Sequence, residues 1–220
     1  MKYLRKFETE ADVQMLVQPN VVLVADTESV MFNVPMPNGA YIQHIDGNLY
    51  TTDQWTANGF ANDEANGVAV IGTKAKFVIA KTFYTYEKWS SDVTNEVQGV
   101  KATTSVDTAK TNYSGAANTT LIAVDDTSGA AYKCTNFVFP NGANGYLPAL
   151  GEWNEAYAYK ADIDAAMTLI GGKAFGSSTH WSSTQYDADD AWGLRWSDGN
   201  NSIVSKNVNC HARAFTALNI

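Results

Sequence analysis

The segment "WGLRWSDGNNSIVS" (192–205) constrains the fold of this chain more than any other stretch. Trp192, Leu194 and Trp196 recur with period two, and a β-strand places alternate residues on the same face. Gly199 then suits a hairpin turn, and "SIVS" continues as a second strand. The C-terminal region therefore predicts an antiparallel strand set that holds its tryptophans in a core and turns small polar residues outward.

Composition limits the classes of protein that fit. The chain has 220 residues, of which 45% are hydrophobic and 12% aromatic, so one large globular domain with a small appendage is expected. A net charge of −8 gives no basic face for nucleic acid or anionic lipid. The start "MKYLRKFETEADV" lacks a following apolar run. We expect no nucleic-acid partner, no membrane insertion and no signal peptide.

Residues 1–38 differ from the rest and are expected to form a small N-terminal unit. Thr9 opens a predicted short helix, and "VVLV" (21–24) and "VMFNV" (30–34) predict a hairpin. "PMPNG" (35–39) then breaks the chain. A unit this small cannot form its own core, so it is expected to attach the protein to a virion or to build an oligomer.

Residues 39–220 alternate strand and helix patterns, which predicts an α+β domain with antiparallel strands and about two main helices. The expected elements are a hairpin at 40–51, a short helix within 51–60, strands at 67–71 and 76–83, helices near 105–111 and 116–123, a strand at 134–139, one bent or two successive helices at 151–172, and the strands of the C-terminal region.

No catalytic or metal motif is complete. His180 has serines nearby in "GSSTHWSS", but no G-x-S-x-G elbow accompanies them. Cys134 is expected to be a buried thiol and Cys210 an incidental one, because neither belongs to a zinc pattern. We expect a protein that is not an enzyme and that holds no metal or cofactor.

Two acidic groups also have plain interpretations. Glu152 and Glu155 lie three residues apart on a predicted helix, where carboxylates are usually solvated helix formers rather than a glycosidase pair. "DADD" (187–190) lacks the spacing of a calcium loop, which favours a solvated acidic loop.

The motifs "GYLPALGEWNEAY", "AAMTLIGG", "WSSTQYDADDAWGLRW" and "ARAF", in this order, resemble the variable proteins of diversity-generating retroelements, especially those carried by phages of gut bacteria. The resemblance covers roughly residues 40–220 and implies a C-type lectin-like fold. In that family, residues near the C-terminus vary through error-prone copying of template adenines. An AAC codon randomised in this way becomes NNC, which never encodes Trp, Lys, Gln, Glu or Met. The irregular positions of this C-terminal region all belong to the NNC set, whereas the residues outside it are Trp181, Gln185, Trp192, Trp196 and Lys206.

Two relatives of that fold fit less well. Formylglycine-generating enzymes need a cysteine pair that Cys134 and Cys210 do not match. Calcium-dependent lectins carry E-P-N or Q-P-D followed by W-N-D. Here "QYD" (185–187) has Tyr186 in place of the proline, and "WSD" (196–198) has Ser197 in place of the asparagine.

The resemblance implies a ligand-binding protein on a phage tail or an extracellular surface, recognising a bacterial surface protein or glycan. A conventional glycan-binding lectin and a structural virion protein are the alternatives, and a homo-oligomer such as a trimer would form through residues 1–38. The expected binding face consists of His180, Asp187, Asp189, Asp190, Gly193, Arg195, Ser197, Asn201, Ile203, Ser205, Asn207, Asn209 and His211.

Overall fold

The structure, a computed structural model, describes residues 22–25, 28–31 and 36–220. Strands β1 (Val22–Ala25) and β2 (Glu28–Met31) pair antiparallel, as the sequence predicts for a hairpin here. The helix expected to open at Thr9 lies outside the described residues. The attachment or oligomerisation role of residues 1–38 stays a prediction.

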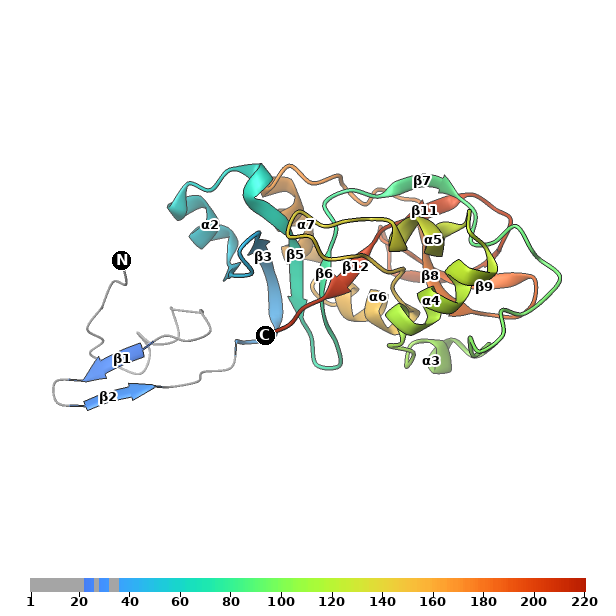
Figure 1. Cartoon of the computed structure of the whole chain (residues 1–220), viewed down its shortest axis with the longest axis horizontal. Coiled ribbons are helices and arrows are strands. Elements are labelled where there is room, and N and C mark those ends of the chain that lie inside the picture. The colour runs from blue at the N-terminus through green and yellow to red at the C-terminus, as the bar shows by residue number, and fades with distance from the viewer. Residues whose placement is uncertain (1–21, 26–27, 32–35) are drawn as a thin grey trace.

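One five-stranded sheet has the order β12–β6–β5–β3–β4, and all its pairs are antiparallel (Figure 1). Its strands are β3 (Gly39–His44), β4 (Leu49–Tyr50), β5 (Ala65–Ile71), β6 (Lys76–Ile79) and β12 (Phe215–Ala217). The predicted hairpin and both predicted strands that follow it are present. The short helix α2 (Thr52–Asn58) begins where expected, because Thr51 and Gln54 form a capping box across its first turn.

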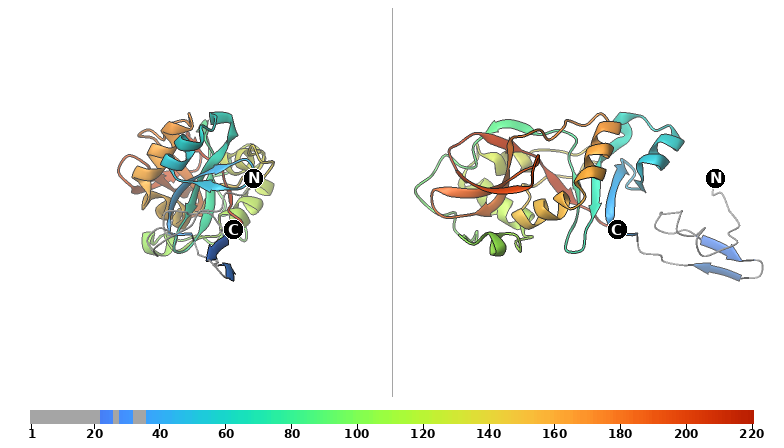
Figure 2. Two further views of the ribbon diagram at one scale, coloured as in Figure 1. Left: turned by 90° about the vertical axis from the view of Figure 1, so that its left-hand side faces the viewer. Right: turned by 180° about the vertical axis from the view of Figure 1, so that it is seen from behind.

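The other five-stranded sheet has the order β10–β9–β8–β11–β7. In the right-hand view of Figure 2, its C-terminal strands lie together in orange and red. Its strands are β7 (Tyr84–Glu87), β8 (Thr179–Gln185), β9 (Asp190–Arg195), β10 (Asn200–Ser205) and β11 (Cys210–Ala212). β8, β9 and β10 form the antiparallel set that the sequence predicts, with Gly199 in the turn at φ 73°. β11 departs from that prediction: it pairs parallel to β8, because the chain crosses to the far side of β8 after β10.

The described residues contain six α-helices and one 3-10 helix, more than the two or so expected. They are α2, η1 (Asn62–Glu64), α3 (Val106–Ala109), α4 (Gly115–Asp125), α5 (Ala130–Thr135), α6 (Leu150–Tyr157) and α7 (Lys160–Leu169). The domain is therefore α+β. The segment 151–172 forms two successive helices, which is one of the two predicted arrangements.

The predicted strand at 134–139 is wrong. Cys134 ends the buried face of α5, which also contains Ala130 and Ala131. Within 134–139 the β-structure is limited to one isolated bridge, between Val138 and Asn144. Small residues at i, i+1 and i+4 suit a helix face pressed on a core, and that packing overrides the β-propensity of "CTNFVF".

The core has two layers, one on each face of β8 and β9. Ala191 and Trp181 pack with Cys134 in one layer, whereas Trp192 and Leu194 pack with α6 in the other. Helices thus cover both faces of these strands. The predicted burial of the three C-terminal tryptophans is confirmed, since Trp181, Trp192 and Trp196 are 0%, 3% and 2% exposed.

Each of these indoles also meets a hydrogen-bond acceptor, as a buried tryptophan requires. The Nε1 atom of Trp192 donates to the carbonyl of Thr103 at 2.9 Å, and that of Trp181 to the carbonyl of Glu87 at 2.8 Å. Within the part of the chain that the structure describes, no helix has the length and apolar character needed to cross a bilayer.

Candidate recognition surface

Strand β10 is the outer strand of its sheet and pairs only with β9. None of its six residues is fully buried, whereas six of seven are buried in β8 and four of six in β9. Its side chains are short and mostly polar: Asn, Asn, Ser, Ile, Val and Ser. The segment expected to carry the binding face therefore reaches solvent at the sheet edge, while the strands behind it are held between two core layers.

The strand register corrects the composition of the predicted face. Arg195 lies opposite Asn200, and Gly193 opposite Ser202, so these four residues share one face of the sheet. Asn200 and Ser202 were not among the residues predicted from the sequence. The number of residues in the turn fixes the register of a hairpin, and a shift of one residue exchanges the two faces.

The other β10 residues of the predicted face lie on the opposite side. Asn201 pairs with Leu194, and Ile203 pairs with Trp192. The expectation that they share a face with Arg195 is wrong. An edge strand is open on both sides, however, so both sets reach solvent around the same rim.

A row of polar groups follows the Arg195 side. The Nε atom of Arg195 lies 2.9 Å from Asp198 Oδ1, and the backbone N–H of Asn200 donates to the same oxygen at 3.1 Å. Hydrogen bonding from Arg195 holds the pKa of Asp198 below its usual range. Asn200 Nδ2 donates to Ser202 Oγ at 3.2 Å. Asp198 and Asn200 are exposed, and Arg195 and Ser202 are half-buried. Polar contacts that water can reach contribute little to stability, so these groups can exchange partners with a ligand.

The opposite side is less uniform. Asn201 accepts a hydrogen bond of 2.8 Å from Asn154 of α6 and is half-buried. Ile203 is 48% exposed. Ser205 donates to Asn207 Oδ1 at 3.2 Å, and Asn207 and Asn209 are exposed in the turn that follows.

His180 and His211 do not belong to this surface. His180 is 0% exposed, and its Nε2 atom lies 3.1 Å from the carbonyl oxygen of Phe175. Burial, followed by the charge of Arg213, holds the pKa of His180 well below its usual value. His211 is half-buried, with its ring centroid 5.2 Å from that of His180, on the β11 side of the sheet. The expectation that they share one exposed face with the β10 residues is wrong, because β11 joins β8 rather than β10 and His180 is buried.

Gly193 is also a structural residue. A Cβ atom there would lie 2.6 Å from Thr179 Cγ2 and 2.8 Å from the carbonyl oxygen of His180. The two strands approach so closely that only glycine fits. The expectation that Gly193 is an exposed, changeable position is wrong, because helices cover both faces of β9.

In the acidic loop 187–190, a carboxylate of the loop accepts hydrogen bonds from the loop's own backbone. Asp187 Oδ1 accepts hydrogen bonds from the backbone N–H groups of Asp189 at 2.9 Å and Asp190 at 2.8 Å. Asp189 is exposed, while Asp187 and Asp190 are half-buried. Burial, then the charges of the other two carboxylates, raises the pKa of Asp190. In the described ranges no group of three or more His, Cys, Asp and Glu side chains is arranged to hold a metal ion.

Lys206 fixes this loop from within, a role that the sequence analysis missed. The side chain is 0% exposed, and its Nζ atom donates to the carbonyl of Ala188 at 2.6 Å, to Gln185 Oε1 at 3.0 Å and to the carbonyl of Asn95 at 3.3 Å. Burial lowers the pKa of Lys206, and neighbouring carboxylates oppose that shift. One ammonium group thus joins the loop near residue 95 to the loop that precedes β9.

Glu152 corrects another expectation. It is buried rather than solvated, and it accepts hydrogen bonds from the backbone N–H of Ala149 at 2.7 Å and from the hydroxyl of Tyr146 at 2.9 Å. Burial raises its pKa to about 7, although these hydrogen bonds oppose the shift. A Cβ atom at Gly115 would lie 2.1 Å from Glu152 Oε2, so α4 begins against this carboxyl group. Glu155 is half-buried and bonds to Thr73.

The structure therefore divides the predicted face into parts. β10 and its flanking turns bring together Arg195, Ser197, Asn201, Ile203, Ser205, Asn207 and Asn209, and Asp190 pairs with Ser205 at the end of β10. His180, Gly193 and His211 are excluded. Cys134 and Cys210 are free thiols, and both are buried.

A solved structure resembles this chain, whereas sequence comparisons find nothing. No protein-family model matches this chain, and no curated protein matches it. A fimbrial protein from Bacteroides ovatus ATCC 8483 has a similar fold, with a TM-score of 0.57 and 13% sequence identity over 82% of this chain. The match covers 48% of that protein, so this chain spans about half of its length. At this identity the likeness shows a shared fold alone.

Proposed function

We propose that this chain is a non-enzymatic binding protein with a C-type lectin-like fold, diversified by a retroelement and displayed on a phage particle or another extracellular surface. It recognises a bacterial surface protein or glycan through an edge surface that consists of Arg195, Ser197, Asn200, Asn201, Ser202, Ile203, Ser205, Asn207 and Asn209.

The observation that carries this proposal is the division between anchor and edge within one short segment. Trp181, Trp192 and Trp196 are buried, and so are Gln185 and Lys206. These are the residues that an NNC codon cannot encode. Every residue of the edge surface is one that it can encode, and none of them is fully buried. A change at an exposed edge position usually costs little stability, so this arrangement suits a surface whose sequence changes on a constant fold.

The chemistry of the edge surface suits wet, hydrogen-bonded recognition. It has one Arg, seven Asn or Ser residues and one apolar side chain, Ile203. The tryptophan and tyrosine anchors that dominate binding hot spots are missing from it. This variant is therefore expected to bind its target with modest affinity. Variants with the same fold and an aromatic residue on the edge surface would bind more tightly.

A second candidate follows from the structural neighbour, which is a fimbrial protein. Because the two proteins share a fold, a structural role in a surface filament is the second function to test. Filaments in electron micrographs of the purified full chain would support this role, and a particle of constant size at all concentrations would oppose it.

Two displayed libraries test the binding function. In the first, Asn200, Ser202 and Ile203 are replaced by NNC codons; in the second, the buried residues His180, Ala191 and Gly193 are replaced in the same way. We expect most clones of the first library, and few of the second, to resist proteolysis. Selection of the first library on a panel of purified bacterial surface proteins and glycans should then yield binders. A folded library without any binder would contradict the proposed function, and an unfolded one would contradict the edge surface itself.

A further inference from the structure

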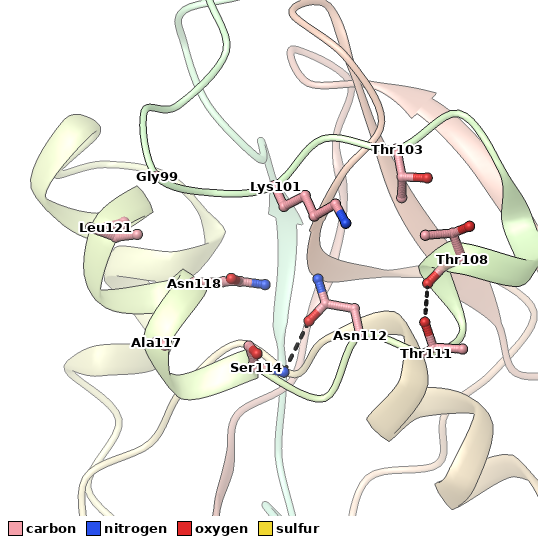
Figure 3. A pocket seen from close by; sticks show the side chains of 10 residues that line it. All are labelled: Gly99, Lys101, Thr103, Thr108, Thr111, Asn112, Ser114, Ala117, Asn118 and Leu121. Carbon is pink, nitrogen blue, oxygen red and sulfur yellow. Dashed lines mark hydrogen bonds between the residues drawn. The ribbon is translucent and has the colours of Figure 1, made fainter.

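A pocket of about 380 Å³ opens between the loop 99–103 and the segment 108–121, and no residue of the edge surface lines it (Figure 3). Pockets for small molecules have volumes of roughly 300–1,000 Å³, so this one suits a ligand at the small end of that range. For this stretch the sequence predicts only helices near 105–111 and 116–123.

The frame of the pocket is tied to the core. The backbone carbonyl of Thr103 accepts the hydrogen bond from Trp192, and Asn118 of α4 is buried with its Nδ2 atom 3.5 Å from Ser183 Oγ of β8. Gly99 has φ 87°, and a Cβ atom there would lie 3.1 Å from Leu121 Cδ1. The loop therefore closes on Leu121 at a position suited to glycine, and the pocket is formed before any ligand arrives.

Several polar groups in the pocket have no partner among the described residues. Lys101 forms no ion pair or hydrogen bond, Asn118 Oδ1 accepts none, and the hydroxyl of Ser114 makes none. Asn112 uses its Oδ1 atom to accept from the Ser114 N–H at 2.9 Å, which leaves its Nδ2 atom free. Figure 3 shows the ends of Lys101, Asn112 and Asn118 converging from three sides.

The charge and the apolar contacts narrow the ligand class. Lys101 is the one charged residue in the lining, so the pocket is positive within a chain of net charge −8. A phosphate-rich ligand would need several cations, and a nucleobase would need an aromatic face. The lining offers instead one cation, donors and acceptors suited to hydroxyl groups, and the small apolar surface of Ala117 and Leu121.

We propose that this pocket binds an acidic sugar, a hexuronic acid or a similar unit of a surface polysaccharide. Its carboxylate pairs with the ammonium group of Lys101. Its hydroxyl groups bond to Asn112, Ser114 and Asn118, and its C–H face lies on Leu121. The site shares no residue with the edge surface and does not depend on diversification.

Titration of the full chain with sodium glucuronate, followed by ¹H–¹⁵N NMR, tests the proposal. Backbone amides within 99–121 and the indole N–H of Trp192, which bonds to Thr103, should shift together, with a Kd on the order of 1 mM. Glucose should bind more weakly and acetate more weakly still. No shift with glucuronate would overturn the site, glucose binding equally well would overturn the role of the carboxylate, and acetate binding equally well would overturn the sugar.

Variants assign the contacts. Lys101→Met should weaken glucuronate binding about fivefold, the upper end for an exposed ion pair, and leave glucose binding unchanged. Lys88→Met, an exposed lysine outside the pocket, is the matched control and should change neither. Asn112→Ala should weaken both sugars without touching the buried Asn118. Equal effects of Lys101→Met and Lys88→Met would overturn the proposed pairing.

Discussion

Gly193→Ala is a sharp test of how tightly the strands behind the edge surface are packed. The added methyl group would lie 2.6 Å from Thr179 Cγ2 and 2.8 Å from the carbonyl oxygen of His180, both closer than ordinary contact. The Thr179 side chain can rotate, but the backbone oxygen belongs to the β8–β9 pairing and cannot move alone. Overpacking of this kind costs about 1–3 kcal/mol. For a chain of this size each kcal/mol lowers the Tm by about 2–4 °C.

The matched control is Ser202→Thr, which also adds one carbon atom. Ser202 lies directly opposite Gly193, but on the open strand β10. Thr keeps the hydroxyl group and favours a strand, so its Tm should equal that of the parent or exceed it slightly. Calorimetry of both variants decides the matter. A Gly193→Ala variant as stable as the parent would show that β9 tolerates change at this position and that its classification as structural is wrong.

Four further predictions follow from the same structure. Trp192→Ala should lower the free energy of unfolding by about 3–5 kcal/mol in denaturant titrations, because it empties a core site and removes the bond to Thr103; an unchanged midpoint would refute its anchoring role. Lys206→Met should destabilise the chain by about 3 kcal/mol, because the carbonyls of Ala188 and Asn95 and the amide oxygen of Gln185 lose their donor, and faster hydrogen exchange should appear in loop 186–190. The pKa of Glu152 is raised from 4.5 to about 7, so its contribution to stability is complete below about pH 4.5 and is lost as the pH rises through 7. Each pKa unit is worth about 1.4 kcal/mol, so the free energy of unfolding should fall by about 3 kcal/mol between pH 4.5 and pH 8. Glu152→Gln should abolish this difference in thermal melts at the two pH values. Calcium and EDTA should leave the Tm unchanged, since the lectin tripeptides are broken at Tyr186 and Ser197, whereas a true site at a hundredfold excess over its Kd would add about 2.7 kcal/mol.

Local patterns predicted most of the elements correctly. The period-two tryptophans, the turn at Gly199, the capping box at Thr51 and the helices that end before Gly171 all follow rules that act within a few residues. Such rules need no knowledge of the partner strand. The strand predicted at 134–139 failed because tertiary packing selected a helix for Ala130, Ala131 and Cys134.

The candidate site depended on information that is not local. The register of β9 against β10 decides that Asn200 and Ser202, rather than Asn201 and Ile203, accompany Arg195. The parallel pairing of β11 with β8 decides that His211 lies far from β10. Period two indicates two faces of a strand but not whether both are covered, which is why Gly193 and His180 were assigned to solvent.

The polar pocket and the buried Lys206 were missed for a related reason. The sequence shows that segment 99–121 is rich in Thr, Ser and Asn. Only the fold, however, brings Lys101 and Asn118 to the same cavity. A lysine between polar residues appears solvated in a sequence. Three carbonyl-type acceptors from distant segments make its burial favourable, and their approach is a property of the chain's path.

Sequencing of the coding locus in many sibling clones tests the central claim most directly. If β10 and its turns form a diversified recognition surface, differences among siblings will fall on the edge surface, chiefly at Asn200, Ser202, Ile203, Asn207 and Asn209, and will be limited to residues that NNC codons encode. A reverse transcriptase gene and a template repeat will lie nearby. Siblings that are identical, or that differ evenly along residues 39–220, would contradict the account.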